Sequence, residues 1–154
     1  MQPVTLEYKG YIVTTDKSTM KLDDIHRWLT TEAYWSKQIP YETVKIAFEN
    51  SFCIGVLHKD QQIGYARFVT DYASFAYLAD VYVEETHRGI GLSKKMLEVL
   101  MNEYWVKKLR RIMLATIGAH GLYQQYGFTA PKFPDRLMEI TRAGIYGDAS
   151  NPCK

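Results

Sequence analysis

The sequence has little cysteine and no long apolar run. Its two cysteines, Cys53 and Cys153, are too few for a disulfide framework and lack the spacing of metal ligands. The four histidines are scattered along the chain, so we expect no metal site. The sequence contains no stretch of about 18 apolar residues, so no membrane span is predicted. Residues 1–7 lack the basic start and apolar core of a secretory signal. These absences favour a cytoplasmic protein.

Net charge is also nearly missing. The chain carries 19 basic and 17 acidic side chains, a net charge of +2 at pH 7, which is too small to indicate a nucleic-acid partner. Apolar residues make up 47% of the chain and charged residues 23%, proportions that exclude a disordered protein. Because the sequence contains no repeat, low-complexity tract or Pro/Ser-rich linker, we expect a single domain over residues 1–154. A monomer and a homodimer both remain open.

Hydrophobic periodicity predicts several strands interrupted by helices. Apolar residues at helical spacing, such as Leu22, Ile25 and Trp28, predict helices, and short β-branched runs predict strands. The predicted order is a strand over 11–15, helices from 22 and over 41–50, an antiparallel hairpin over 51–58 and 62–70, a strand over 76–83, a helix over 92–106, a strand over 111–116, a helix over 119–126, and strands beginning at 128 and over 138–141. This order predicts an α+β, or mixed α/β, sheet domain and not a doubly wound nucleotide fold.

A glycine-rich turn joins the predicted strand that ends at Val83 to the helix that begins near residue 92. In Arg88-Gly89-Ile90-Gly91-Leu92-Ser93, the glycines permit a tight turn and let a ligand approach the backbone closely. Unpaired N–H groups at a helix start bind anions, at about 1.5–3 kcal/mol for each charge-assisted hydrogen bond. We therefore expect a pyrophosphate site. On the glycines alone, a turn that only closes the strand–helix connection is an equal alternative.

Two motifs together resemble those of the GNAT N-acetyltransferase superfamily. Residues 88–93 resemble the family's acyl-CoA loop, (Gln/Arg)-x-x-Gly-x-(Gly/Ala), with Ser93 in the final small position. Residues 119–128, Ala-His-Gly-Leu-Tyr-Gln-Gln-Tyr-Gly-Phe, resemble its second signature, Ala-x-x-x-Tyr-x-x-x-Gly-Phe. Thr116 stands where the family often has Asn. The resemblance implies a central, mostly antiparallel, splayed β-sheet flanked by helices. It also implies acetyl-CoA as co-substrate and CoA as product, bound by Val81, Tyr82, Val83, Arg88, Gly89, Ile90, Gly91, Leu92, Ser93, Thr116 and Tyr123.

The same resemblance implies direct transfer of an acetyl group to the primary amine of a small-molecule or amino-acid-like acceptor. It makes Tyr123 the general acid that protonates the departing CoA thiolate. The attacking amine must also lose a proton, which costs roughly 4–5 kcal/mol at pH 7 for a lysine-like amine. Asp80, a carboxylate inside an apolar run, is a candidate base or substrate-orienting group. Strand alternation places Asp80 on the other face of the sheet from Tyr77, Ala79 and Val81 unless a bulge intervenes. A purely structural role for Asp80 is the alternative.

The same resemblance implies that residues in the first third of the chain and in the hairpin form the acceptor site. Aromatic side chains would form its wall, with one positive charge from Arg67 and one negative charge from Asp71. The substrate-binding residues we expect are Tyr34, Trp35, Asp71 and Tyr77. Packing in the core is the alternative for each aromatic residue. Two further functions remain open: an acyl-CoA-binding or sensing domain without catalysis, and a phosphate-binding interaction domain unrelated to CoA.

Overall fold

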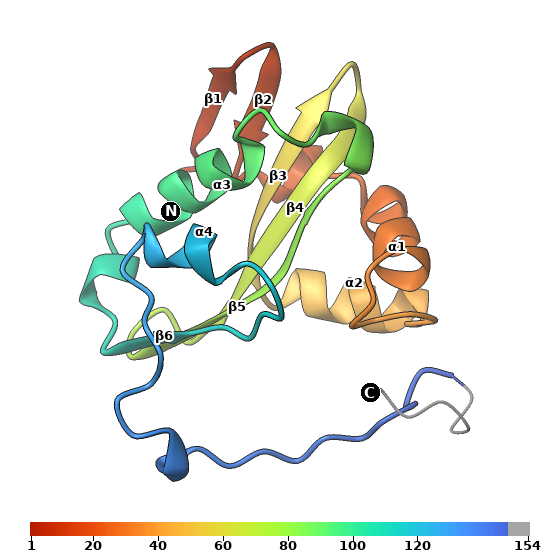
Figure 1. Ribbon diagram of the computed structural model, residues 1–154. Helices are drawn as coiled ribbons and strands as arrows, with labels where there is room; N and C mark the ends of the chain where they lie inside the picture. Colours follow the sequence, from red (N-terminus) through yellow and green to blue (C-terminus); the bar gives the residue numbers. More distant parts are fainter. Residues whose placement is uncertain (148–154) are drawn as a thin grey trace.

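A six-stranded sheet forms the centre of the computed structural model, which describes residues 1–147 (Figure 1). The strands lie in chain order: β1 (Thr5–Tyr8), β2 (Tyr11–Thr14), β3 (Phe52–His58), β4 (Gln61–Thr70), β5 (Phe75–Val83) and β6 (Arg111–Met113). The first five pair antiparallel, and β6 alone pairs parallel with β5. The predicted α+β class with a mostly antiparallel sheet is therefore confirmed. Cys153 lies outside the described residues.

Helices cover both faces of this sheet. They are α1 (Leu22–Thr31), α2 (Tyr41–Glu49), α3 (Leu92–Asn102) and α4 (His120–Gln124). In Figure 1, α1 and α2 lie on one side of the strands, and α3 and α4 lie on the other. One apolar cluster joins the sheet to α3, around Phe68, Leu97 and Leu100. A second joins it to α1 through Trp28 and Tyr82, whose rings stack at 5.1 Å.

The sheet splays between β5 and β6. These strands pair only from Phe75 to Tyr77 of β5, so the rest of that β5 edge has no strand beside it in the described chain. A bulge lies in the same part of β5, because two residues, Asp80 and Val81, occupy the interval opposite Ala66 alone. Asp80 adopts φ +56° there. The bulge reverses the alternation and directs Asp80 to the α1–α2 face, where its carboxylate meets Arg67.

Several predicted elements differ from the structure. Strand β1 was not predicted, and α3 ends at Asn102 instead of 106, since Val106 begins a 3-10 turn. The two predicted C-terminal strands, from 128 and over 138–141, are absent. Pro131 and Pro134 interrupt the first because proline cannot donate to a sheet ladder. The second has no neighbouring strand within residues 1–147, and Figure 1 shows this part of the chain running away from the body.

Neither a bilayer-spanning helix nor a group of metal ligands is present in residues 1–147. No helix in this range is both long and apolar enough to cross a membrane. Nor do three or more His, Cys, Asp or Glu side chains gather where they could hold a metal ion. Cys53 is buried, and burial raises the pKa of its thiol. It therefore contributes as a small packed side chain and not as a reactive thiolate.

Candidate active site

Free backbone amides line the turn between β5 and α3. Gly89 and Gly91 adopt φ +83° and +88°, a left-handed conformation that disfavours side chains with a Cβ. Within the described chain, no acceptor binds the N–H groups of residues 89 to 94. The amide of Arg88 is not free, since it donates to the carbonyl of Glu85 at 3.2 Å. The turn thus offers consecutive donors at a helix start, as an anion site requires.

The first hairpin holds this turn in place. The hydroxyl of Tyr8 and the ammonium of Lys9 both donate to the carbonyl of Ile90, at 3.0 and 3.1 Å. Because that carbonyl points to the hairpin, it does not accept from the N–H of Lys94. A Cβ on Gly91 would lie 2.9 Å from the Tyr8 hydroxyl, whereas a Cβ on Gly89 would meet only open space. The side of the turn at Gly89 is therefore open to a ligand.

The free edge of β5 leads from the turn toward the cavity. The N–H of Glu84 donates to Ile63 of β4, so strand alternation turns the N–H groups of Val81 and Val83 to the free edge. Arg88 donates from Nε to the Val83 carbonyl at 2.7 Å and fixes the end of the strand. Tyr82 faces the other way: its backbone lies opposite Tyr65, and its hydroxyl donates to Glu32.

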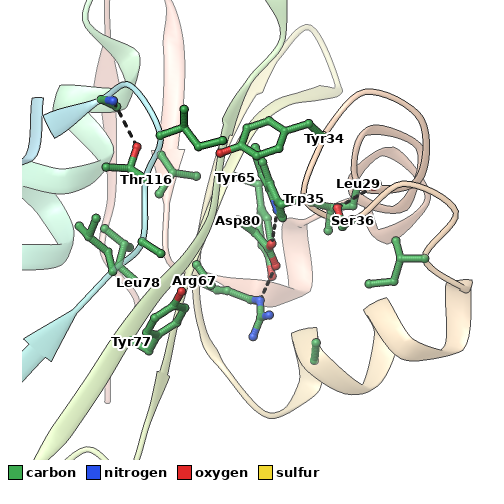
Figure 2. Close-up of a pocket in the computed structure, with 18 of the residues that line it drawn as sticks. Leu29, Tyr34, Trp35, Ser36, Tyr65, Arg67, Tyr77, Leu78, Asp80 and Thr116 are labelled. Atoms are coloured by element: carbon green, nitrogen blue, oxygen red, sulfur yellow. Dashed lines mark hydrogen bonds and ion pairs between the residues drawn. The ribbon is translucent and has the colours of Figure 1, made fainter. Parts of the chain in front are cut away.

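A cavity of about 980 Å³ lies where β5 and β6 separate. Tyr34, Trp35, Tyr77 and Asp80 line it, and Figure 2 shows them together with Arg67 around one space. Tyr123, Thr116 and Val81 line the same cavity. The backbone strand edge, the motif tyrosine and the predicted acceptor side chains therefore meet at one place.

Asp71, which the sequence suggests for the acceptor site, is not among the residues that line this cavity. Its carboxylate accepts hydrogen bonds from the amides of Ala73, Ser74 and Phe75 at 2.8–3.1 Å and from the Ser74 hydroxyl. These bonds, led by the one from the Ser74 hydroxyl, lower the pKa of Asp71 well below its usual value. Asp71 thus caps the β4–β5 turn. The pattern Asp-x-x-Ser is a turn signal that the sequence already contained.

Asp80 is held at the cavity wall by two donors. Arg67 donates from Nε to one carboxylate oxygen at 2.6 Å, and Trp35 donates from its indole N–H to the other at 2.9 Å (Figure 2). Both members of the ion pair are largely buried. Burial alone would lower the pKa of Arg67, but the Asp80 carboxylate raises it above its usual value. The two hydrogen bonds therefore fix the orientation of the Asp80 carboxylate.

Tyr123 combines burial with access to the cavity. Only 9% of the residue is exposed, and its ring packs against Phe128 at 6.0 Å. Burial, with a smaller contribution from the Tyr34 phenol, raises the pKa of Tyr123 above its usual value. The hydroxyl thus keeps its proton at neutral pH and can donate it. Thr116 supports the start of α4 by accepting from the Ala119 amide at 3.2 Å, and Tyr126 donates to the Lys94 carbonyl at 2.8 Å.

Comparison with known proteins identifies this arrangement. The family model described as "Acetyltransferase (GNAT) family" matches residues 22–128. The chain belongs to the GNAT acetyltransferase family. A Xanthomonas campestris protein described as belonging to the GNAT family has a solved structure that is 42% identical, with a TM-score of 0.88 over 92% of this chain and 100% of that one. A Gibberella zeae protein whose name proposes it as an acetyltransferase is 30% identical over 127 residues, 69% of this chain and 71% of its own length.

The GNAT assignment makes the chain an acyl-CoA-dependent acetyltransferase, and acetyl-CoA is the usual donor in this family. The residues present fit that donor: free amides and an open Gly89 suit a diphosphate, and the unpaired β5 edge suits an amide-containing arm. Sequence reasoning missed the contribution of Tyr8 and Lys9, which hold the loop from 81 or more residues away. No local motif could have indicated a contact of that sequence separation.

Proposed function

We propose that this enzyme transfers the acetyl group of acetyl-CoA directly to the primary amine of a small-molecule acceptor. The single cavity that contains both Tyr123 and the Asp80–Arg67 pair carries this proposal. Donor and acceptor can meet there without an intermediate covalent enzyme group. Among the described residues no cysteine lines that cavity, and its one lining serine, Ser36, donates its hydroxyl hydrogen to the Leu29 carbonyl at 2.7 Å.

The backbone would hold the donor. The N–H groups of residues 89–94 would bind the diphosphate, and the β5 edge at Val81 and Val83 would pair with the pantetheine arm as an added strand does. Acetyl-CoA supplies the acetyl group as an activated thioester. An N–H on the same edge would donate to the thioester carbonyl oxygen, where negative charge develops during transfer. The splay of β5 from β6 supports this assignment, because it leaves these groups available.

Tyr123 would donate its hydroxyl proton to the departing sulfur, and the phenolate would regain a proton from the amine nitrogen, which releases one on acylation. Its raised pKa supports this role, since the phenol remains protonated at the pH at which the enzyme works. The burial that raises the pKa also excludes water that could compete as the proton donor. A positioned general acid of this kind contributes about 10²- to 10⁴-fold in rate.

Asp80 would accept a hydrogen bond from the incoming amine and orient it. Each of its carboxylate oxygens already accepts one protein hydrogen bond and retains further acceptor capacity. Because Arg67 and Trp35 hold the carboxylate in a fixed orientation, Asp80 is suited to orienting an amine. We assign it as the orienting group of the two roles that the sequence allowed.

The cavity wall also favours a class of acceptor. Arg67 and Asp80 are the charged side chains among its described lining residues, and they neutralise each other. Tyr34, Trp35 and Tyr77 form much of the remaining surface. An acceptor with an aromatic or apolar body and one amine would match this surface. A second free charge on the acceptor would lack a partner in the cavity and would lose its hydration there.

The test is thiol release from acetyl-CoA with a panel of aryl-alkyl amines, amino acids and polyamines. We expect turnover with the first group, and a loss of about 10²-fold or more in kcat for Tyr123→Phe while CoA binding is kept. Tyr126→Phe is the matched control, because it removes a hydroxyl that bonds Lys94 outside this cavity. Equal rates for Tyr123→Phe and the parent would remove the general-acid role. Binding of acetyl-CoA without turnover of any amine would instead favour the sensing domain.

A further inference from the structure

The acceptor cavity continues past Asp80 into a helix compartment between α1, α2 and the sheet. The wall of this compartment comes from both helices, the loop that joins them and β4, through Leu29, Ser36, Ile39, Val44, Ala47 and Tyr65. Figure 2 shows Leu29 and Ser36 on one side of Asp80 and Thr116 on the other. The cavity therefore has two ends: a donor end at Thr116 and Tyr123, and the helix compartment.

The side chains of the helix compartment are apolar or already paired. Among the six wall residues just named, only Ser36 and Tyr65 carry a polar side-chain group. The Ser36 hydroxyl donates to the Leu29 carbonyl at 2.7 Å, and the Tyr65 hydroxyl lies 3.3 Å from the Cys53 thiol. Burial raises the pKa of Tyr65 well above its usual value, so its phenol stays neutral. The compartment therefore suits an uncharged apolar group, which gains free energy when it leaves water.

The geometry of acyl transfer directs the acceptor toward the helix compartment. The amine nitrogen must face the thioester carbon, so its carbon substituent must point away from the donor. Under the proposed function the thioester lies at the Tyr123 end of the cavity, and Asp80 orients the amine between the two ends. A substituent that points away from Tyr123 at this position enters the helix compartment.

Helix α2 presents one face to the compartment and another to solvent. Val44 and Ala47 are three residues apart, so they lie on the same face of the helix, and both line the cavity. Ile46 does not line it and is 53% exposed. A larger side chain at position 47 would therefore occupy the compartment, whereas the same side chain at position 46 would extend into solvent.

On the basis of the proposed function, we propose that the helix compartment binds the apolar tail of the acceptor and that Ala47 sets the length of that tail. The acceptor is then a primary amine whose uncharged tail reaches from Asp80 to α2. A shorter tail leaves the compartment unfilled and gains less from burial. A charged tail loses its hydration without finding a partner there.

The first test compares kcat/KM for 4-phenylbutylamine with kcat/KM for benzylamine, at saturating acetyl-CoA. The parent enzyme should favour the longer amine, and Ala47→Phe should lower the ratio of the two values by about 10-fold or more. Ile46→Phe is the matched control and should keep the parent's ratio. A ratio does not depend on the fraction of folded enzyme, so lost stability cannot imitate this result. An unchanged ratio in Ala47→Phe, or an equal change in Ile46→Phe, would overturn the proposal.

A second measurement needs no turnover, so it separates a failure of this proposal from a failure of the proposed transfer. With CoA bound to the parent enzyme, the ring protons of 4-phenylbutylamine should give intermolecular NOEs to the methyl groups of Val44 and Ala47 and none to those of Ile46. An amine that does not bind, or NOEs that avoid Val44 and Ala47, would overturn the proposal. If these NOEs appear but no amine is acetylated, the compartment binds the tail and the proposed transfer alone fails.

Discussion

Two glycines with the same backbone conformation allow the proposed diphosphate site to be separated from general stability. Gly89 and Gly10 both adopt φ +83°, and a Cβ on either would meet no atom within 4 Å. Alanine at either position should therefore cost a similar strain of about 1–2 kcal/mol in the free energy of unfolding. Only Gly89 lies in the turn with the free amides, so only Gly89→Ala should place a methyl group between those amides and a phosphate.

The size of the difference follows from the hydrogen bonds at risk. Loss of one charge-assisted bond costs about 1.5–3 kcal/mol, or roughly 10- to 150-fold in affinity. Calorimetric titration with CoA should show a loss of this size for Gly89→Ala and less than about threefold for Gly10→Ala. Pantetheine, which lacks the diphosphate, should bind both variants alike. If the two variants lose CoA affinity equally, or if Gly89→Ala also weakens pantetheine, the diphosphate is not held at this turn.

The glycine turn, the buried Tyr82 and the acceptor site each allow a further test. Gly91→Ala should lower the free energy of unfolding by about 1–3 kcal/mol. The loss should be smaller in a Tyr8→Phe background, because the hydroxyl that would lie 2.9 Å from the new Cβ is then absent. Equal losses in the two backgrounds, measured by denaturant titration, would contradict this contact. Burial, followed by the hydrogen bond to a carboxylate, raises the pKa of Tyr82 to about 12. Since the pKa of tyrosine in the unfolded chain is about 10, this contribution to stability is complete below pH 10 and is lost as the pH rises toward 12. Tyr82→Phe should therefore remove up to about 2 kcal/mol of the fall in the free energy of unfolding over this range. Parallel curves of unfolding free energy against pH for the variant and the parent would refute this. Asp80→Asn should raise the KM for the amine roughly 10-fold without changing the KM for acetyl-CoA. Asp71→Asn, outside the cavity, should change neither KM. If both variants raise the KM for the amine equally, Asp80 does not orient the amine.

The sequence predicted most of the fold where the pattern was local. Helices α1 to α3 and the β3–β4 hairpin follow apolar periodicity and turn signals closely. Strand β1 was missed because residues 5–8 are only half-buried at the sheet margin and carry a weak alternation. The strand over 138–141 was predicted from a genuine alternation, but pairing depends on a neighbour, which the periodicity of one segment does not specify.

The site was predictable to the extent that it uses backbone and motif. Tyr34, Trp35, Tyr77 and Asp80 line one cavity with Tyr123, and their roles there stay a prediction. The amide of Arg88 and the side chain of Asp71 each form hydrogen bonds within a turn a few residues away, which the sequence pattern did not reveal. The position of Asp80 depended on a bulge that propensity alone does not fix. Long-range contacts, such as that between Tyr8 and Ile90, arise from the assembled fold.

The proposed diphosphate site consists of individual N–H groups, so the most direct measurement observes them one by one. A ¹⁵N-resolved NMR titration of the full chain with CoA should shift the amide signals of residues 89 to 94 most strongly and leave Gly10 unmoved. Titration with pantetheine should shift Val81 and Val83 but not the turn. If the signals of residues 89–94 stay in place while CoA saturates the protein, the coenzyme is held elsewhere and the account fails.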